Sequence, residues 1–315
     1  MNKISLIVPC YNEEESIPYL TVELNKLMKK MNYVDFEVIM IDNCSNDNTL
    51  KLLKDLNKKD KRYKYISFSR NFGKDSSMYA GLENCTGDYA AILDADLQDP
   101  PELIIKMYDL INNNEYDCIA TYRENRKGEP WLRSLLANSF YKIINKLSEY
   151  EIKSGARDFR LMNRKMINAI LELNEVERFT KGIFSWVGFN VKWISFENHE
   201  RVAGETKLPM KSAANYAIKG IVSFSTIPLK LASVIGFIFC LAAIIYIFYV
   251  VINHLFNGSH IAPGYSSLMC VVLLGFGLTL LVLGIIGQYI AQMYNEVKNR
   301  PKYIINECSS NIKKM

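Results

Sequence analysis

The chain has 315 residues, a formal net charge of +5, 49% hydrophobic residues and 23% charged residues. This balance supplies enough apolar side chains for a sizeable core and excludes a disordered or collagen-like chain. The seven cysteines are odd in number and scattered without a C-x-x-C pair, which excludes a disulfide-rich scaffold and a cysteine zinc site, and the modest charge gives no reason to expect nucleic acid.

Short β-rich segments alternate with longer amphipathic segments through the first 121 residues or so, which is typical of an α/β fold. Several of the β-rich segments are continuous apolar runs, as buried parallel strands usually are. The expected strands are Ile4–Val8, Phe36–Ile41, Tyr65–Phe68, Tyr89–Leu93 and Asp117–Thr121. The sequence therefore predicts a mostly parallel sheet with helices between its strands.

Three of these helices have recognisable starts. They are expected after Asn12, near Asn48 and after Asp99, where polar side chains can cap a first turn. At the third start, prolines and a glutamate follow the aspartate in the order of a capping box. Because each start follows a strand, polar loops should collect at the carboxyl edge of the sheet, where open α/β folds bind ligands.

Carboxylates gather at this expected edge. Asp42 follows the second strand, and Asp94, Asp96 and Asp99 follow the fourth. Such close carboxylates would repel one another without a cation, so a hard divalent metal holding a diphosphate is the expected partner. Taken alone, the D-x-D pattern is also compatible with solvated loop aspartates. G-x-G-x-x-G and G-x-x-x-x-G-K-[ST] are both absent, which excludes the dinucleotide fingerprint and the P-loop.

The C-terminal part differs because no Asp, Glu, Lys or Arg lies between Leu231 and Asn295, where an even spread would place about 15. Two spans, about 232–252 and 268–290, each reach the roughly 20 apolar residues that cross a bilayer. Lysines and arginines flank this pair of spans but are absent from the turn between them, so the positive-inside rule predicts cytoplasmic termini. Two buried helices of a soluble bundle are the alternative.

The expected organisation has four parts: a cytoplasmic domain at 1–206, interfacial amphipathic helices at 207–230, two transmembrane helices within 231–291 and a basic cytoplasmic tail at 292–315. No secretory signal precedes the first strand. The interfacial segment could instead pack against the protein itself. Glycines in the spans permit close helix packing, within the hairpin or between subunits, and a homo-oligomer is expected.

A series of motifs adds to this interpretation. They are V-P-C-Y-N-E at Val8–Glu13, I-D-N-C-S-N-D-N-T at Ile41–Thr49, S-R-N-F-G-K at Ser69–Lys74, D-A-D-L-Q-D-P-P-E at Asp94–Glu102, D-F-R-L-M at Asp158–Met162, R-F-x-x-G at Arg178–Gly182, G-E-T-K at Gly204–Lys207 and Q-Y-I-A-Q-M-Y-N-E-V-K-N-R-P at Gln288–Pro301. In this order they resemble the family-2 glycosyltransferases with the GT-A (Rossmann-like) fold. Within that family, the chain is similar to the bacterial undecaprenyl-phosphate glucosyltransferases and dolichol-phosphate mannose synthase.

The resemblance implies an inverting, metal-dependent enzyme that moves one hexose from a nucleotide-sugar, with UDP-glucose the leading donor, to undecaprenyl phosphate. The reaction would take place on the cytoplasmic face of the bacterial inner membrane and serve glycosylation of cell-envelope polysaccharide. A phosphate monoester is already largely ionised near pH 7, so the reaction requires no strong general base.

Site residues follow from the same resemblance. The implied residues are Pro9, Tyr11, Glu13, Asp42, Asp94 and Lys207 for the donor nucleotide, Asp96 and Gln98 for Mg²⁺ or Mn²⁺, Arg126 and Arg133 for the acceptor phosphate, and Asp94, Asp96, Asp158 and Arg160 for catalysis. Two alternatives stay open: the basic stretch that carries the two acceptor arginines could be a solvated loop, and Asp158 could be a structural partner of Arg160.

The chain also departs from the family pattern. The second loop usually reads D-D-G-S, but Asn43 and Cys44 replace the second acid and the glycine, which leaves base preference open. Ala137 stands about where a serine could touch the acceptor phosphate. The Q-x-x-R-W signature of processive synthases is absent, which favours transfer of a single sugar.

Other functions are compatible with the same residues. The closest variant is the same reaction with mannose, galactose, N-acetylglucosamine or a modified arabinose. The altered second loop motivates a different hypothesis, a catalytically silent membrane scaffold, against which the retained acidic residues argue. A processive polysaccharide synthase is a third and weaker hypothesis.

Overall fold

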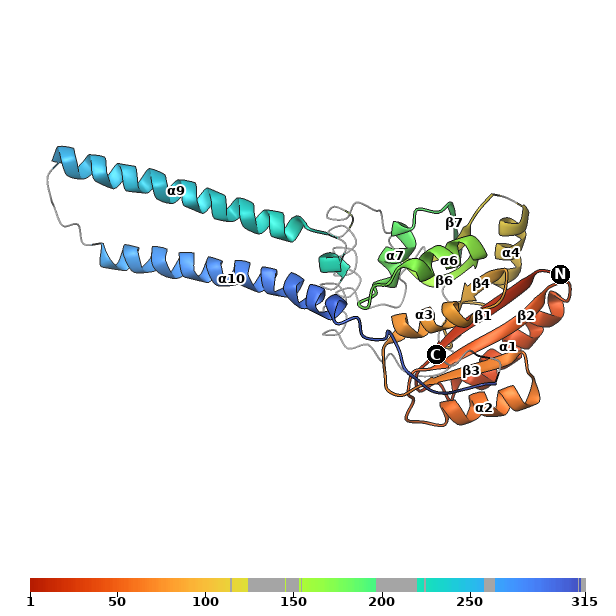
Figure 1. The fold of residues 1–315 in the computed structure, drawn as a ribbon. Coiled ribbons are helices and arrows are strands. Elements are labelled where there is room, and N and C mark those ends of the chain that lie inside the picture. Colours follow the sequence, from red (N-terminus) through yellow and green to blue (C-terminus); the bar gives the residue numbers. More distant parts are fainter. Residues whose placement is uncertain are drawn as a thin grey trace.

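The computed structural model describes residues 1–113, 115–123, 145, 153, 155–196, 220–223, 225–257, 264–310 and 312. Across these residues, an eight-stranded sheet runs in the order β7-β5-β6-β4-β1-β2-β3-β8, and two long helices extend away from it (Figure 1). The strands are β1 (Lys3–Cys10), β2 (Asp35–Asp42), β3 (Tyr63–Phe68), β4 (Tyr89–Ile92), β5 (Cys118–Arg123), β6 (Ala156–Asn163), β7 (Val191–Phe196) and β8 (Ile305–Cys308). The helices are α1 (Ser16–Lys30), α2 (Thr49–Lys59), α3 (Lys74–Asn84), α4 (Leu103–Asn113), α6 (Arg164–Glu172), α7 (Thr180–Trp186), α9 (Ile227–Asn257) and α10 (Tyr265–Val297).

The sheet is the middle of three layers. On one face, α1, α2 and α4 pack against alternate strand residues such as Leu6 and Val38. On the other face, α3, α6 and α7 cover the intervening residues, such as Ile7 and Ile39. Because successive strand residues point to opposite faces, the apolar runs of β1 and β2 are buried on both sides.

The predicted mostly parallel sheet is confirmed. β1 pairs in parallel with β2 and β4, β2 with β3, and β5 with β7. All five expected strands are present. The three expected helices are also present as α1, α2 and α4, so that the loops after β1, β2 and β4 share one edge.

Two of the expected helix caps are wrong. The N-cap residues of α1 and α2, Glu15 and Asn48, form no side-chain capping hydrogen bond. Asn12 Oδ1 instead accepts a hydrogen bond from the Asn46 amide at 2.8 Å, and Asn48 Nδ2 donates to Glu14 Oε2 at 2.8 Å. These polar side chains connect the loops after β1 and β2 to each other, because both loops lie at the same edge of the sheet.

Strand β6 introduces the antiparallel part of the sheet. It runs antiparallel between β4 and β5, and its register pairs Ile92 with Arg160. Continued by two residues, this register brings Asp158 opposite Asp94, which follows β4. A carboxylate distant in sequence is thereby delivered to the edge formed by the parallel strands.

The segment after α10 returns to the sheet (Figure 1). β8 pairs antiparallel with β3 at the edge of the sheet. Tyr303 stacks on Phe68 with ring centroids 5.1 Å apart, and Ile312 is buried in the same core cluster. Part of the segment expected as a basic tail is therefore folded onto the domain.

Helices α9 and α10 lie side by side as an antiparallel pair (Figure 1). Each contains an uncharged apolar segment long enough to cross a membrane. At about 1.5 Å per residue, 31 and 33 residues exceed the ~30 Å of a hydrocarbon core, so both helices extend beyond it. Large apolar side chains such as Phe237 and Leu273 are more than 60% exposed, which fits a lipid-facing surface.

Helix α3 crosses β1 at unusually short range. A Cβ at Gly81 would lie 2.2 Å from Ile7 Cγ2, so glycine is needed at this crossing. The close packing fixes α3 against the middle of the sheet. Its first residue, Lys74, is thereby held at the carboxyl edge of β4.

Candidate active site

The loops after β1 and β2 form the first part of the site and hold each other in place. The Asn12 amide donates to Ser45 Oγ at 2.9 Å, and the Glu13 amide donates to Thr49 Oγ1 at 2.8 Å. Pro9 pairs with Ile41 one residue before the end of β1, and Tyr11 directly follows the strand. The structure thus brings together three of the expected nucleotide residues, Pro9, Tyr11 and Glu13, beside the end of β2.

Asp42, the fourth expected nucleotide residue, is only 1% exposed. Its Oδ2 accepts a hydrogen bond from Ser67 Oγ at 2.8 Å, and its Oδ1 accepts one from the Ser45 amide at 3.0 Å. The carboxylate therefore shapes the loop after β2 and joins it to the end of β3.

The departure from the family pattern at Asn43 and Cys44 has a structural counterpart. Asn43 Oδ1 accepts from the Phe72 amide at 2.8 Å, and Asn43 Nδ2 donates to Asn71 Oδ1 at 2.9 Å. Asn43 thus connects the loops after β2 and β3. Cys44 has φ = 60°, in the left-handed region that favours glycine, so the glycine of the family pattern suits this backbone better than cysteine does.

Lys74 is the centre of the charged part of the site. Its Nζ lies 2.7 Å from Asp94 Oδ1 and 2.7 Å from Asp158 Oδ2. The three residues come from the start of α3, the loop after β4 and strand β6. Lys74 retains 43% of its side-chain exposure, whereas Asp94 and Asp158 retain 24% and 15%. The cluster is therefore open to a ligand from the side of the lysine.

The charges in this cluster reinforce one another. Burial acts to raise the pKa of Asp158, but Lys74 and Lys181 outweigh it and lower that pKa well below its usual range. Burial acts to lower the pKa of Lys74, but Asp158 and Asp94 outweigh it and raise that pKa. Asp158 is therefore ionised near neutral pH and is a poor proton acceptor, because a general base works best with a pKa near the working pH.

The loop after β4 carries the expected metal ligands. Asp96 Oδ1 accepts from the Gln98 amide at 3.1 Å, and the intervening Leu97 has φ = 57°, so the loop turns sharply. Asp99 is 1% exposed and is bound by Arg157, with Nε to Oδ1 at 3.0 Å and Nη2 to Oδ2 at 3.2 Å. Asp99 therefore anchors the loop to the start of β6.

The donor set of this loop fits a hard divalent cation. Two of the loop carboxylates, Asp94 and Asp99, are each engaged by a cationic side chain. Asp96 supplies a carboxylate, and Gln98 supplies an amide oxygen that also accepts a hydrogen bond from Arg157 Nη2 at 3.5 Å. Mg²⁺ is usually held by one or two carboxylates together with substrate phosphates. In the described part of the chain, no three His, Cys, Asp or Glu side chains converge as a complete protein metal site. The loop suits a metal that a bound diphosphate helps to hold.

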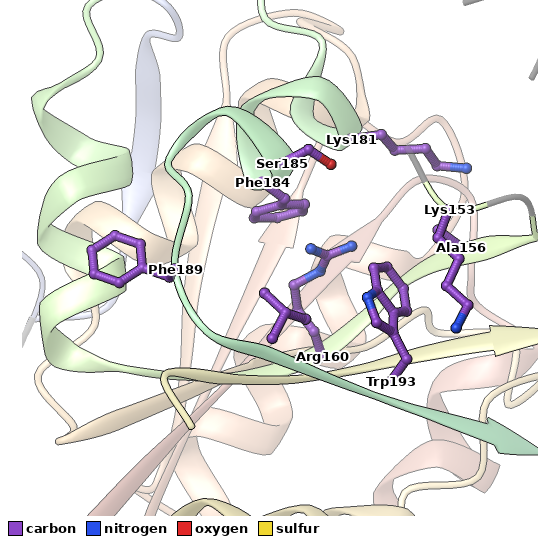
Figure 2. A pocket seen from close by; sticks show the side chains of 9 residues that line it. Lys153, Ala156, Arg160, Lys181, Phe184, Ser185, Phe189 and Trp193 are labelled. Carbon is purple, nitrogen blue, oxygen red and sulfur yellow. The ribbon is translucent and has the colours of Figure 1, made fainter. Parts of the chain in front are cut away.

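A cationic cavity of about 170 Å³ adjoins this cluster beneath α7. Its residues include three cations and four large apolar side chains; the lining consists of Lys153, Ala156, Arg160, Lys181, Phe184, Ser185, Phe189, Val191 and Trp193. Figure 2 shows the Arg160 guanidinium between the Phe184 ring and the Trp193 indole. The guanidinium carbon is 3.5 Å from the Phe184 ring centroid.

The residues predicted from sequence divide into three groups. The structure brings Asp94, Asp96, Gln98, Asp158 and Arg160 to one edge of the sheet. The ends of β1 and β2 and the loop after β1 bring Pro9, Tyr11, Glu13 and Asp42 to the same edge. The predicted residues Arg126, Arg133 and Lys207 lie outside the described residues, as do most of the expected interfacial helices at 207–230. Their roles stay predictions.

Sequence reasoning missed three cations of the site, Lys74, Arg157 and Lys181. Lys74 closes the S-R-N-F-G-K motif, so the motif itself was the available signal. Arg157 directly precedes the D-F-R-L-M motif, and Lys181 lies inside R-F-x-x-G. Each is adjacent to a recognised motif, but only the fold shows which carboxylate it faces.

Comparison with known proteins extends over the whole chain. The family described as glycosyl transferase family 2 matches residues 5–171. A putative glycosyltransferase CsbB of Bacillus subtilis is 43% identical, over 97% of this chain and 92% of its own. The bactoprenol glucosyl transferase of Shigella phage SfII is 37% identical, over 97% and 98%, and a prophage bactoprenol glucosyl transferase homolog of Escherichia coli is 36% identical, over 96% and 98%.

A solved structure can be set beside these relatives. Glucosyl-3-phosphoglycerate synthase from Mycobacterium tuberculosis, in complex with Mn²⁺, UDP and glucosyl-3-phosphoglycerate, is 17% identical and covers 70% of this chain and 78% of its own, with a TM-score of 0.45.

Proposed function

Because the chain belongs to glycosyl transferase family 2, we propose that this enzyme moves a single hexose from a nucleotide-sugar, UDP-glucose first among the candidates, to undecaprenyl phosphate. Its relatives include bactoprenol glucosyl transferases, and it carries two apolar helices beside its α/β domain. The product would be a membrane lipid bearing one sugar, made on the cytoplasmic face for use in cell-envelope polysaccharide.

The observation that carries this proposal is the extent of the likeness to the bactoprenol glucosyl transferases. It spans at least 96% of this chain, and therefore both the sheet and the apolar helices. A likeness confined to the sheet would support sugar transfer without a lipid acceptor. Likeness through the helices supports an acceptor that resides in a membrane.

The loops at the carboxyl edge suit the donor. Pro9, Tyr11, Glu13 and Asp42 would contact the nucleotide, and Asp42 would also keep the second loop in shape. Asp96 and Gln98 would hold Mg²⁺ or Mn²⁺ together with the donor diphosphate. When bound, the metal would neutralise charge on the departing nucleoside diphosphate. The ammonium of Lys74 would add positive charge on the same side.

The acceptor suits a site without a general base. An oxygen of the lipid phosphate would form a bond to the anomeric carbon, while the bond from that carbon to the diphosphate breaks and its electron pair leaves with the nucleotide. The acceptor is already ionised and loses no proton in this step. The low pKa of Asp158 is compatible with this chemistry, because the carboxylate is required as a fixed charge that orients Lys74.

The helices suggest how the enzyme sits on its substrate. With both termini cytoplasmic, α9 and α10 would cross the inner membrane as a hairpin, and the sheet domain would face the cytosol. The acceptor phosphate resides at that surface. Arg126 and Arg133, together with interfacial helices within 207–230, are expected to act there, and glycines on the spans are expected to support a homo-oligomer.

A donor screen on the purified protein tests the proposal. The protein in detergent is incubated with undecaprenyl phosphate, Mn²⁺ and each of several nucleotide-sugars, and both nucleotide release and sugar in the lipid phase are measured. We expect UDP-glucose to give a lipid-linked monosaccharide. Another productive donor would correct the sugar, whereas no lipid-linked sugar with any donor would refute the function.

An Asp96→Ala variant sharpens the screen. It is expected to lose at least about a hundredfold of turnover, because loss of metal-assisted charge stabilisation is costly. Glu102→Gln is the matched control, since Glu102 forms an exposed ion pair with Lys30 at the far end of the same loop. Unchanged turnover in Asp96→Ala would remove this residue from the metal site.

A further inference from the structure

Arg160 is a buried cation near Asp158, but that carboxylate is itself bound by Lys74. Arg160 is only 2% exposed. Its side chain donates hydrogen bonds to two backbone carbonyls, from Nη2 to Arg157 O at 2.9 Å and from Nε to Asp158 O at 3.4 Å. Within the described part of the chain, no ion pair to Arg160 forms. A buried charge is costly unless it is paired, so an incoming anion that pairs directly with Arg160 would be favoured.

Two lysines share the cavity with Arg160. Lys153 Nζ lies 4.0 Å from the Tyr122 ring centroid and 5.2 Å from that of Trp193, so aromatic rings hold it at the rim. Lys181 approaches from α7 and is close enough to influence Asp158. None of the described residues that line the cavity is acidic. The cavity is therefore a positively charged recess.

The remaining walls are apolar. Phe184, Phe189 and Trp193 contribute three aromatic side chains, and Figure 2 shows Phe184 and Trp193 on either side of Arg160, with Phe189 farther away. At about 170 Å³ the cavity is smaller than the roughly 300 to 1,000 Å³ typical of pockets for drug-sized ligands. It is therefore too small for a whole nucleotide-sugar. A small anionic group attached to an apolar chain matches both its charge and its walls.

The cavity also lies at the correct place relative to the charged cluster. Arg160 and Asp158 are two residues apart on β6, which places their side chains on the same face about 7 Å apart. Asp158 is held by Lys74, which also binds Asp94 beside the proposed metal loop. A phosphate in the cavity would thus lie next to the sugar of a donor bound over that loop.

We propose that this cavity binds the phosphate monoester end of the acceptor, with Arg160, Lys181 and Lys153 contacting the phosphate and the aromatic side chains contacting the first units of the prenyl chain. The inference rests on the proposed function for the identity of the acceptor. The acceptor contacts then come from Arg160 on β6, Lys181 on α7 and Lys153, which precedes β6. They add to the contacts expected from Arg126 and Arg133.

Equilibrium binding of farnesyl phosphate to the full-length protein in detergent tests the cavity without requiring turnover. Lys181→Ala is expected to weaken this binding about tenfold, because it removes one charge-assisted contact. Farnesol, which lacks the phosphate, should bind weakly and equally to wild type and variant. Lys181→Arg keeps the charge and should stay within about threefold of wild type.

Lys192→Ala is the matched control. Lys192 precedes Trp193 on β7, so its exposed side chain points to the opposite face of the sheet. Its loss removes the same charge from the same strand and should leave farnesyl phosphate binding unchanged. Equal binding of farnesyl phosphate by wild type and Lys181→Ala would overturn the proposal, as would an equal loss in Lys192→Ala.

Kinetics separate the acceptor from the donor. In Lys181→Ala and Lys153→Ala, the KM for undecaprenyl phosphate should rise about tenfold, while the KM for UDP-glucose stays within twofold. A rise in the donor KM alone would assign the cavity to the donor diphosphate and overturn the proposal. If wild type transferred no sugar but still bound farnesyl phosphate through Lys181, the proposed function would fail and the cavity would stand.

Discussion

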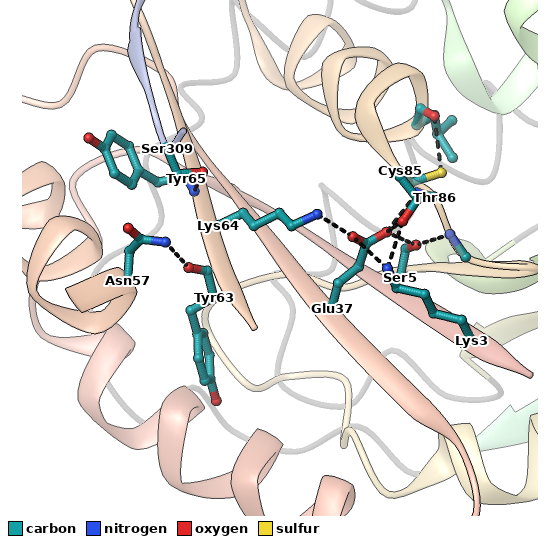
Figure 3. A network of polar contacts seen from close by, with 12 residues as sticks. Lys3, Ser5, Glu37, Asn57, Tyr63, Lys64, Tyr65, Cys85, Thr86 and Ser309 are labelled. Carbon is teal, nitrogen blue, oxygen red and sulfur yellow. Dashed lines mark hydrogen bonds and ion pairs between the residues drawn. The ribbon is translucent and has the colours of Figure 1, made fainter. Parts of the chain in front are cut away.

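Clusters of charge lie at opposite ends of the same parallel strands, and they are built differently. At the amino ends, Glu37 is 2% exposed and accepts hydrogen bonds from Ser5 Oγ, Lys64 Nζ and the Thr86 amide, each at 2.6 Å (Figure 3). At the carboxyl ends, the bridging group is the lysine, and Lys74 keeps 43% of its exposure.

The difference indicates what each cluster does. The carboxylate of Glu37 is enclosed by protein donors, so its partners are complete in the folded chain. Lys74 and its two carboxylates instead leave a charged surface open to solvent, beside a loop suited to a metal and a diphosphate. Enclosed charge of the first kind contributes to stability, whereas open charge of the second kind is available to a substrate.

Lys74→Ala is expected to have the largest effect. Without the ammonium, Asp94 and Asp158 face an anionic donor with no cation between them, so turnover should fall on the order of 10²- to 10³-fold. The free energy of unfolding should fall by less than about 2 kcal/mol, since the lysine is partly exposed. Steady-state kinetics and denaturant unfolding in detergent measure both quantities.

Lys74→Arg is the control for this variant. It keeps the positive charge but not the geometry, and it should recover part of the lost turnover. If Lys74→Ala kept wild-type turnover and lost stability instead, the carboxyl-edge cluster would be structural, and the contrast with Glu37 would disappear.

Glu37→Ala should act in the opposite way. Removing one partner of a buried charged group leaves Lys64, which is 12% exposed, without its anion, at a cost of about 3 kcal/mol in unfolding free energy. Turnover per folded molecule should stay within about twofold of wild type, because the network lies at the far edge of the sheet. Lost turnover in a folded variant would contradict this assignment.

The exposed Lys30–Glu102 pair provides the comparison for Glu37. Its atoms are 2.7 Å apart, but both side chains are more than half exposed. Glu102→Gln should therefore cost less than about 1 kcal/mol. A similar loss in both variants would show that burial does not distinguish the two ion pairs.

Lowering the pH should remove the stabilisation that the Glu37 network contributes to the fold. Burial acts to raise the pKa of Glu37, but hydrogen bonds from Lys64, Ser5 and Thr86 outweigh it and lower that pKa from 4.5 to about 2. A lowered folded-state pKa means that the stabilisation is fully present above pH 4.5 or so and is lost as the pH falls toward 2. The loss should amount to about 2 kcal/mol between pH 5 and 3.

Unfolding curves recorded at several pH values test this slope. Glu37→Gln carries no titrating group at this position, so its stability should fall less steeply over the same range. Asp158 also has a lowered pKa and should contribute acid sensitivity to both proteins. Parallel pH profiles for wild type and Glu37→Gln would remove Glu37 as the source of the difference.

The parallel half of the fold could be predicted from sequence because its signals are local. Apolar runs such as Phe36–Ile41 identify buried strands, and the absence of charge between Leu231 and Asn295 identifies the apolar helices. Strands β6 and β8 could not be found in this way. β6 inserts antiparallel between β4 and β5, and β8, near the end of the chain, pairs with β3 in its first quarter, so both depend on distant contacts.

For the site too, local features could be predicted from sequence and long-range contacts could not. Asp94 and Asp96 follow a recognisable strand, so their place at the sheet edge follows from local sequence. The pairing of Lys74 with Asp158 does not, because it requires the register between β4 and β6. Asp42 illustrates the converse, since its position was expected, yet its carboxylate is used by Ser67 and Ser45 inside the protein.

Glu296→Gln is expected to have the smallest effect on stability and activity. Glu296 lies where the apolar helix α10 meets the α/β domain. Near the end of α10, Glu296 Oε1 accepts hydrogen bonds from the amides of Val176 and Glu177 at 3.0 and 2.9 Å. This segment leads into α7, whose residues line one side of the Arg160 cavity. Loss of the charge should weaken these bonds by about 1 kcal/mol, so exchange of the two amides should accelerate about fivefold.

Hydrogen exchange followed by mass spectrometry measures this local change, with Glu172→Gln as the control because Glu172 is exposed on α6. The amino-edge network is remote from this junction, so amides around Glu37 should exchange at wild-type rates. The Arg160 cavity, by contrast, is lined by α7, so the KM for the acceptor should rise about twofold in Glu296→Gln. Faster exchange without any change in acceptor KM would show that α7 keeps its place independently of α10, and that the helices anchor the domain without shaping its site.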